Sequence, residues 1–406
     1  MSVIVEQPYQ FVPPHRGNGW PTWIQRLRLV DVYLHKKEGI VGHECRHLDR
    51  FAESLQRGDS VLLAPNHCRY ADPLVLGWPF REVGTHVYAM ASWHLFNRHG
   101  FDSFAIRKMG GFSIFRESPD RQSLETAIDI LATGERPLVL FPEGTTNRTN
   151  DRLQPLLEGI SFIARNAARR RQKQAGGRVV IHPVGIKYVF TGDIEGWSDA
   201  ALTTIEQRIG WAPPYGIGLL DRIRRVADAL LTLKEIEHLG ASQAGSLPQR
   251  RDALIEALLQ PIEARYELAS ADQPALNRVR SVRSKLLPTL QHKATPAGQK
   301  QQLRRELAAA QLAQQLVSYV DGYLDEPPVT ETQVLETIQR FEEDFLGKAS
   351  SPYPLRVILE FDEAIEVPAA RAPRGETDPL LETLATRLRG LLARLQYESA
   401  PLSPQA

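Results

Sequence analysis

The sequence is poor in cysteine and in long apolar runs, and both shortages narrow the class of protein. Its 406 residues include two cysteines, Cys45 and Cys68. So few cysteines exclude a disulfide framework and favour a reducing, cytoplasmic setting. The N-terminus lacks the basic and apolar segments of a secretory signal. No apolar run approaches the roughly 20 residues of a membrane-spanning helix. We therefore expect a cytoplasmic globular protein.

The sequence also lacks a charge of one sign, because its formal net charge is +1. Proteins that bind nucleic acid usually carry a basic surface, so we expect no nucleic-acid partner. Basic residues cluster at 168–173 and again at Arg278, Arg280, Arg283 and Lys285. By default we interpret both clusters as solvated helix faces. The alternative is contact with anionic lipid headgroups for the first cluster, and with a membrane or an acyl carrier for the second.

What the sequence does contain is an alternation of strand and helix patterns between residues 60 and 190. Apolar runs typical of buried strands lie at 60–65, 86–91, 111–116, 137–144 and 178–190. Amphipathic helical patterns separate them. The pattern at 118–135 begins with Ser118 as its predicted N-cap and ends near Gly134. Such alternation predicts an α/β fold, with a mixed, largely parallel sheet covered by helices and an active site beyond the carboxyl ends of its strands.

After residue 192 the sequence pattern becomes helical, and this change predicts how the chain divides into domains. Residues 193–350 read as helix after helix, and strand alternation returns only at 354–367. A strand after so long a helical stretch indicates an insertion within the α/β fold. We therefore predict four parts: an N-terminal tail with an amphipathic helix (1–37), an α/β core (38–192), an all-helical insertion (193–350), and a final strand with a closing helix of the core (351–406).

The predicted N-terminal helix covers residues 20–37. Trp23, Leu27, Val30 and Leu34 form one apolar stripe along it. Tryptophans with flanking basic residues suit a helix that lies on a membrane surface, so we expect peripheral membrane association. A first helix packed on the core is the equally favoured alternative.

A loop after the first core strand holds the clearest chemical pattern. Asp72 and Pro73 suit the N-cap and first turn of a helix, so His67 falls in the loop before it. On a regular helix, side chains five residues apart diverge by about 140°, but in a bend they can converge. A carboxylate that binds one imidazole nitrogen leaves the other free as a general base. The hydroxyl that such a base would activate can belong to a substrate. A simple cap and an inert loop histidine are the alternatives.

Three further blocks follow in order: GGFSIFR ending at Arg116, FPEGT at 141–145 and IHPV at 181–184. Together with Asn-His-x4-Asp at 66–72, they resemble the glycerolipid acyltransferase superfamily, which includes the 1-acylglycerol-3-phosphate acyltransferases. The resemblance covers roughly residues 40–192 and more faintly 354–397, whereas the helical stretch is not covered. Each block alone is a weak signal, but four blocks in this order are specific.

The resemblance implies a glycerolipid acyltransferase-like fold and an O-acyltransferase of phospholipid synthesis or remodelling. In such an enzyme, the resemblance implies, His67 is oriented by Asp72 and removes the proton from a hydroxyl of a lysophospholipid or glycerol phosphate, with lysophosphatidate favoured. The alkoxide then attacks the thioester of acyl-CoA or acyl carrier protein directly. The resemblance implies no acyl-enzyme, no metal and no cofactor.

The same resemblance assigns the acceptor site. Arg116 matches the family arginine that is associated with the acceptor's phosphate, and a guanidinium binds phosphate in a bidentate way. Glu143, Gly144 and Thr145 match the block that shapes the acceptor pocket, where a glycine lets the backbone approach a ligand.

The sequence departs from the lysophosphatidate-type pattern at two positions. Thr146 stands where that pattern has an arginine, and the nearest arginine is Arg148, which we therefore add to the predicted phosphate site. Glu158 stands where that pattern has a lysine. The thinner cationic lining leaves room for another lysophospholipid or a different hydroxyl acceptor.

Three rival interpretations remain open. The segment HECRH matches a zinc-protease motif in which His43 and His47 would bind the metal and Glu44 would act as base, although the sequence marks no third ligand. Cys68 beside His67 offers a thiol nucleophile, but adjacent loop side chains rarely reach each other productively. A non-catalytic lipid-binding or scaffold protein, working through its helical insertion, is the third, and an acyl-transfer assay separates it from the enzyme.

Overall fold

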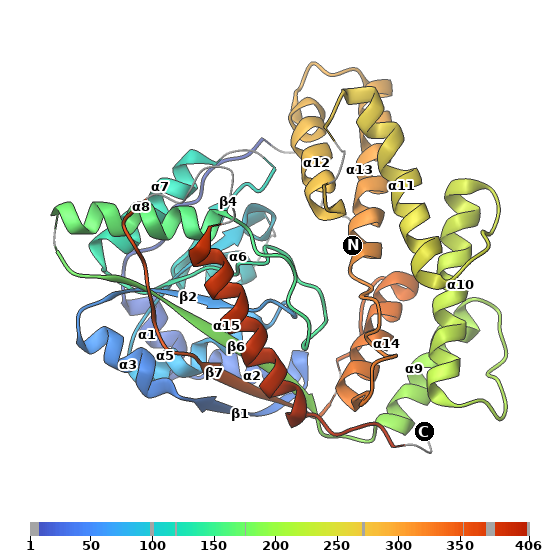
Figure 1. Cartoon of the computed structure of the whole chain (residues 1–406), viewed down its shortest axis with the longest axis horizontal. Coiled ribbons are helices and arrows are strands. Elements are labelled where there is room, and N and C mark those ends of the chain that lie inside the picture. The colour runs from blue at the N-terminus through green and yellow to red at the C-terminus, as the bar shows by residue number, and fades with distance from the viewer. Residues whose placement is uncertain are drawn as a thin grey trace.

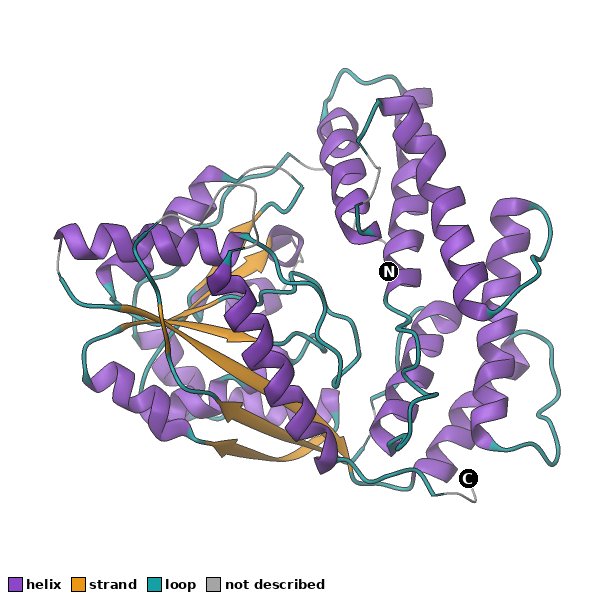
Figure 2. Cartoon of the chain, viewed as in Figure 1, coloured by secondary structure: helices purple, strands orange, loops and turns teal. Residues whose placement is uncertain are grey.

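The structure is a computed structural model that describes residues 8–97, 101–117, 120–174, 176–269, 273–351, 353–370 and 378–403. A sheet covered by helices lies beside a column of helices (Figure 1). The strands are confined to the first of these two parts (Figure 2). Within the described residues, every helix is too short or too polar to cross a membrane.

In the described chain, eight strands form one sheet. Its order is β1-β7-β6-β2-β5-β3-β4, and β8 pairs with β6 beside this path. The strands are β1 Ile40–Arg46, β2 Ser60–Pro65, β3 Tyr88–Ser92, β4 Gly111–Ile114, β5 Leu138–Val139, β6 Val179–Phe190, β7 Leu355–Phe361 and β8 Ile365–Glu366. β6 runs antiparallel to β7 and β8, while β2 is parallel to both β5 and β6. The predicted α/β fold with a mixed, largely parallel sheet is confirmed.

The inner strands β2 and β6 are mostly apolar and are buried on both faces, which explains their position. Every residue of each strand is buried. Val61 and Leu63 pack into the core on one side of the sheet, and Leu62 and Ala64 into the core on the other. Continuous apolar runs of this kind are typical of strands that helices cover on both faces.

Helices from distant parts of the chain cover the two faces. One face carries α7 Arg121–Thr133, α8 Gly159–Gln174 and α15 Pro379–Leu395. The other carries α2 Leu29–Glu38, α3 Leu48–Gln56, α4 Asp72–Val75, α5 Gly77–Val83, α9 Ile194–Arg208 and α14 Glu331–Leu346. Two further helices, α1 Gly19–Arg26 and α6 Phe101–Lys108, belong to the same part of the chain.

The chain between β6 and β7 is helical, as expected. Besides α9 and α14 it holds α10 Leu219–Leu239, α11 Leu247–Tyr266, α12 Ala275–Gln291 and α13 Ala297–Val317. Helices α11, α12 and α13 share a separate core, to which Leu258, Leu286 and Leu307 belong. By contrast, α9 and α14 pack into the core of the sheet. The helical stretch is therefore anchored to the sheet at both its ends, while the exact domain limits stay predictions.

The structure corrects the single helix predicted at 20–37. The chain forms α1 and α2 instead, with a break at Arg28, whose φ of 51° is left-handed. The predicted apolar stripe is divided as a result. Leu34 is fully buried in the core, whereas Trp23 and Leu27 are each 50% exposed.

The zinc-protease interpretation of HECRH requires a helix, and the structure forms a strand there instead. These residues lie in β1, which pairs with β7, and His47 follows the strand with a left-handed φ of 55°. A strand places successive side chains on opposite faces, so His43 and His47 lose the one-turn spacing that the zinc motif requires. This geometry disfavours the metalloprotease interpretation. Pairing with β7, a strand far along the chain, determines the structure of this segment.

The predicted N-cap of α7 is corrected as well. The carboxylate of Asp120 accepts a hydrogen bond from the Ser123 amide at 3.0 Å, so Asp120 is the N-cap. The predicted cap, Ser118, lies outside the described residues. The predicted end is confirmed, because Gly134 follows the helix with a φ of 68°.

Candidate active site

The loop that follows β2 holds the predicted histidine, and Asn66 fixes where this loop leaves the sheet. The Asn66 side chain donates to the carbonyl of Ile186 at 3.0 Å and accepts from the amide of the same residue at 2.6 Å. Asn66 thus continues the pairing of β2 with β6 by one residue through its side chain. The loop begins beyond the carboxyl end of the strand, as the fold class predicts.

His67 and Asp72 meet in this loop. The Nδ1 atom of His67 lies 2.8 Å from Oδ2 of Asp72. The carboxylate can only accept, so Nδ1 carries the hydrogen and Nε2 keeps its lone pair. The imidazole stacks on Phe141, with ring centroids 4.1 Å apart. The pair therefore has the geometry of an oriented general base.

Three further donors hold the carboxylate of Asp72, which is completely buried. The Arg69 amide donates to Oδ2 at 2.9 Å, and the hydroxyl of Tyr188 donates to Oδ1 at 2.7 Å. The Cys68 thiol is a weaker donor, 3.8 Å from Oδ1. Asp72 was predicted as a helix N-cap, but it is the first residue of α4 and its carboxylate makes no cap hydrogen bond. Its side chain turns back into the loop instead.

Cys68 is also completely buried. Its Sγ atom lies 3.5 Å from Oδ1 of Asn150. Burial, together with the charge of Asp72, raises the pKa of the Cys68 thiol well above its ordinary value. Only the thiolate is a strong nucleophile, so this environment disfavours the thiol interpretation.

Glu143 joins the histidine loop to the loop after β5. Its carboxylate accepts from the His67 amide at 2.6 Å, from the Asn147 side chain at 2.9 Å and from the Gln154 amide at 2.8 Å. Burial raises its pKa to about 8, although these three donors act in the opposite direction. Glu143 was predicted to shape the acceptor pocket. With both oxygens engaged and the side chain buried, it can do so by holding two loops together.

Arg116 and Gly144 are brought together. Arg116 follows β4 by two residues, and its guanidinium donates to the carbonyl of Gly144. Gly144 has a φ of 71°, and a Cβ there would collide with the side chain of Leu157. Glycine is therefore required at this turn. Thr145 contacts Gln314 of α13 at 3.3 Å through its hydroxyl.

Arg148 is directed elsewhere. Its amide donates to the carbonyl of Cys68 at 3.0 Å, and its guanidinium lies 2.6 Å from a carboxylate oxygen of Glu343 on α14. It is thus engaged with α14 and not grouped with Arg116. This ion pair disfavours Arg148 as a substitute for the arginine that the lysophosphatidate-type pattern has at position 146.

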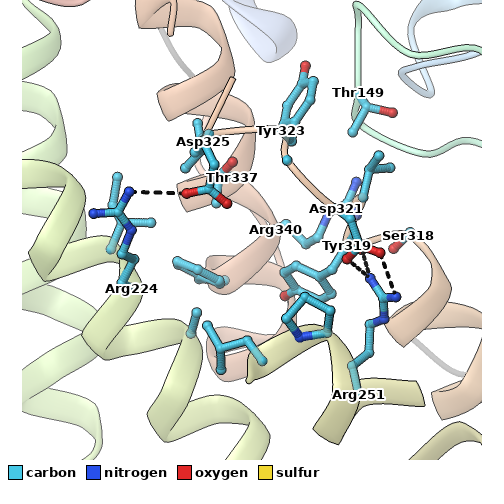
Figure 3. A pocket seen from close by; sticks show the side chains of 18 of the residues that line it. Thr149, Arg224, Arg251, Ser318, Tyr319, Asp321, Tyr323, Asp325, Thr337 and Arg340 are labelled. Carbon is cyan, nitrogen blue, oxygen red and sulfur yellow. Dashed lines mark hydrogen bonds and ion pairs between the residues drawn. The ribbon is translucent and has the colours of Figure 1, made fainter. Parts of the chain in front are cut away.

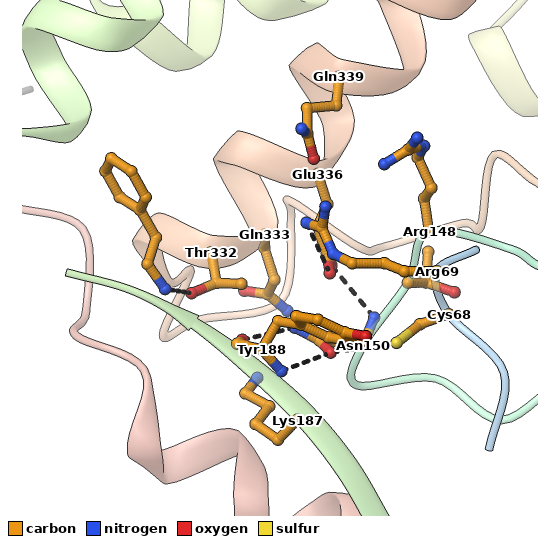
Figure 4. A network of polar contacts seen from close by, with 12 residues as sticks. Cys68, Arg69, Arg148, Asn150, Lys187, Tyr188, Thr332, Gln333, Glu336 and Gln339 are labelled. Atoms are coloured by element: carbon orange, nitrogen blue, oxygen red, sulfur yellow. Dashed lines mark hydrogen bonds and ion pairs between the residues drawn. The ribbon is translucent and has the colours of Figure 1, made fainter. Parts of the chain in front are cut away.

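A buried polar network behind the dyad was not foreseen from the sequence (Figure 4). Glu336 of α14 accepts from the Asn150 amide at 3.1 Å and lies 3.9 Å from Arg69. Asn150 in turn exchanges two hydrogen bonds with the backbone of Tyr188, at 2.7 and 3.1 Å. Polar residues at 69 and 150, beside the recognised blocks, were the available signal. Nothing local marked Tyr188 or Glu336.

An apolar cavity of about 340 Å³ lies next to this loop, between α10, α14 and the chain around 316–325. Its lining includes Ile223, Ala227 and Leu230 of α10 and Phe341 of α14. Arg148 and Thr149 line it too, which places the cavity beside the loop that contacts Cys68. Four of its charged side chains form two ion pairs, Arg224 with Asp325 and Arg251 with Asp321 (Figure 3).

Outside this site, the described residues offer one candidate group of metal ligands: His43, Cys45 and Glu82, whose donor atoms lie within 4.8 Å of one another. Burial raises the pKa of the Cys45 thiol to about 12. His43 stacks on Trp78 with ring centroids 4.1 Å apart. His43 and Cys45 lie on β1 at the edge of the sheet, and Glu82 lies on α5. His43 is the one ligand that this group shares with the zinc motif.

Comparison with known proteins supports the interpretation of the loops. Residues 48–187 match the family model described as Acyltransferase. The matched segment runs from α3 into β6 and contains the His67 loop, Arg116 and the turn at Gly144. It ends before α9, so the helices from α9 to α14 lie outside it. No curated protein matches the chain.

Proposed function

We propose that this chain, whose residues 48–187 form an acyltransferase domain of the glycerolipid acyltransferase family, transfers a fatty acyl group from acyl-CoA or acyl carrier protein to the hydroxyl of a lysophospholipid or glycerol phosphate. The family supports acyl transfer in general. The main observation in support of transfer to a hydroxyl is the pair formed by His67 and Asp72, which leaves one imidazole nitrogen free to accept a proton.

The reaction follows from this geometry. Nε2 of His67 takes the proton from the acceptor hydroxyl while the hydroxyl oxygen attacks the thioester carbonyl. The tetrahedral intermediate then expels the thiolate of the donor, which receives the proton from the imidazolium. The products are an ester and a free thiol, and no group stays on the protein. Asp72 stabilises the imidazolium, and its buried carboxylate is kept in place by Tyr188 and the Arg69 amide.

Arg116 suits the acceptor end of the site. Its side chain is accessible to solvent, and its guanidinium lies at the turn of Gly144 on the same sheet edge as His67. A phosphate group provides paired oxygens that a guanidinium can bind in a bidentate way. We therefore assign Arg116 to the phosphate of lysophosphatidate, glycerol phosphate or a related acceptor.

The apolar cavity suits the acyl chain. Pockets for ligands of this size usually have volumes of about 300–1,000 Å³, and this one has about 340 Å³. Its apolar lining matches a hydrocarbon chain, and its border at Arg148 and Thr149 adjoins the histidine loop. Burial of the chain removes apolar surface from water and favours long-chain donors.

Peripheral membrane association is part of the proposal. Trp23 and Leu27 of the N-terminal segment are half-exposed, and Trp20 is 40% exposed. Aromatic and basic side chains together favour the membrane interface, and Arg26 and Arg28 provide the basic groups.

The test is acyl transfer by the purified full-length chain. Lysophosphatidate, glycerol 3-phosphate and other lysophospholipids are offered as acceptors, each with acyl-CoA and with acyl carrier protein, and free thiol and ester are both measured. We expect equal amounts of thiol and ester with at least one phosphate-bearing acceptor. Thiol release without ester means hydrolysis, and neither product with any pair refutes the function.

A further inference from the structure

Two helices outside the family match contact the candidate acceptor site. On α12, the hydroxyl of Ser284 donates to the carbonyl of Glu117, and the guanidinium of Arg283 lies 3.3 Å from the carboxylate of the same residue. On α13, Gln314 reaches Thr145 at 3.3 Å. These contacts dock the two helices on the turn after β4 and on the turn of Gly144.

The docking brings a second arginine to Gly144. Arg280 lies one helical turn before Ser284, and its Nη2 atom is 3.9 Å from the position that a Cβ on Gly144 would take. Arg116 already donates to the Gly144 carbonyl. Two guanidinium groups therefore converge on one turn, from two parts of the chain. Desolvation by the surrounding protein and the positive charges of Arg280 and Arg283 lower the pKa of Arg116 to about 10, although the charge of Glu117 acts in the opposite direction.

The other arginines of this stretch of α12 have carboxylate partners, and Arg280 has none among the described residues. Arg278 is buried against Glu263 and Glu256, at 2.8 and 3.0 Å. Arg283 pairs with Glu117. The hydrogen bond of Arg280 goes to the neutral side-chain oxygen of Asn277 at 3.1 Å. A half-buried cation beside a second cation is unfavourable unless an anion compensates both.

We infer that Arg280 and Arg116 form a two-arginine site for a phosphate group at the turn of Gly144, so that a helix outside the acyltransferase match contributes to substrate binding. The site rests on the proposed function only in that its phosphate belongs to a substrate. That phosphate is either the headgroup of the acceptor or a phosphate of the thioester donor. Both present the same paired oxygens to the two guanidinium groups.

Binding measured without turnover tests the site itself. Calorimetry with glycerol 3-phosphate is performed on the full-length chain and on the variants Arg280→Ala, Arg280→Lys and Lys285→Ala. Lys285 is an exposed cation on the same helix, so its removal matches the change in net charge. We expect Arg280→Ala to weaken binding about tenfold or more, Arg280→Lys to weaken it less, and Lys285→Ala to leave it unchanged.

Calorimetry with coenzyme A covers the other source of phosphate. If Arg280→Ala weakens the binding of glycerol 3-phosphate, the phosphate in the site is that of the acceptor. If it weakens the binding of coenzyme A alone, the phosphate is that of the donor. Equal binding of both compounds by wild type and folded Arg280→Ala overturns the two-arginine site, as does an equal loss in Lys285→Ala. Because no acyl transfer is involved, an inactive chain that still binds phosphate through Arg280 refutes the proposed function and leaves the site intact.

Discussion

The hydroxyl of Tyr188 and the imidazole of His67 bind opposite oxygens of one buried carboxylate. Tyr188 donates to Oδ1 of Asp72 at 2.7 Å, and His67 contacts Oδ2 at 2.8 Å. Tyr188 lies on β6, whereas the other two residues lie in the loop after β2. Pairing of β2 with β6 therefore positions the dyad. Burial and the nearby Asp72 raise the pKa of the Tyr188 hydroxyl well above its ordinary value, which keeps it a donor.

Replacement of His67 tests the proposed base. We expect His67→Ala to lower kcat about 10²–10⁴-fold, the usual contribution of a general base. The fold should persist, which circular dichroism can check. Cys68→Ser is the matched control and should keep most activity, since its thiol is buried and protonated. A folded His67→Ala protein with normal turnover contradicts the mechanism, and an inactive, folded Cys68→Ser protein revives the thiol nucleophile.

Replacement of Tyr188 tests the positioning of Asp72. Tyr188→Phe removes one hydroxyl and leaves Oδ1 without its short hydrogen bond. We expect a loss of about 1–3 kcal/mol in the free energy of unfolding and a fall in kcat of about 10- to 100-fold through misorientation of the imidazole. The acceptor KM should change little. Tyr397→Phe, at a residue that is 84% exposed, is the control. An unchanged kcat would show that Asp72 needs no second anchor.

Burial of Glu143 predicts a pH-dependent stability. Its pKa rises from an ordinary 4.5 to about 8 in the folded protein. The folded state thus holds this proton more tightly than the unfolded chain does. The contribution of the bound proton to the free energy of unfolding is therefore complete below about pH 4.5 and is lost as the pH rises through about 8. Glu143→Gln cannot ionise. The free energies of unfolding of wild type and of Glu143→Gln are measured in urea from pH 5 to pH 8.5. The difference, wild type minus variant, should decrease as the pH rises. A flat difference would show that Glu143 is ionised throughout.

The cavity predicts a dependence on acyl chain length. Ala227 lines it, so Ala227→Trp should shorten the space that is open to the chain. We expect kcat/KM for a long-chain donor to fall about tenfold relative to a short-chain donor. Leu233→Trp places the same side chain at a residue of α10 that is 47% exposed and should leave the ratio unchanged. An equal loss for both donors in Ala227→Trp means that the chain lies elsewhere.

The exposed N-terminal side chains predict membrane binding. Deletion of the whole segment is a poor test, because Leu34 belongs to the core and Asp31 binds the Trp78 side chain at 2.9 Å. The double change Trp23→Ala and Leu27→Ala removes exposed apolar surface only. We expect it to reduce sedimentation with anionic vesicles.

Ile236→Ala, at an exposed residue of α10, is the control for general loss of apolar surface. Sedimentation that is equal for wild type and for the double variant would show that the N-terminal segment is no anchor.

Much of this protein was determined by local sequence. Apolar runs of strand length, separated by amphipathic patterns, specified the sheet and its two covered faces, because burial on both faces requires continuous apolar side chains. The spacing of His67 and Asp72 specified a loop in which a base and its carboxylate can meet. Each of these features depends on residues that are close together in the chain, so the sequence displays them directly.

Other features depended on contacts that only the folded chain creates. Pairing with β7 made a strand of a segment whose local pattern permitted a helix. Tyr188 reached Asp72 only because β6 lies beside β2, and Arg280 reached Gly144 only because α12 docks on the turn after β4. A buried hydrogen bond or a convergence of charges between distant segments leaves no periodic trace in either segment. Its formation is decided by packing, which brings the two partners within reach and removes the water that would otherwise satisfy them.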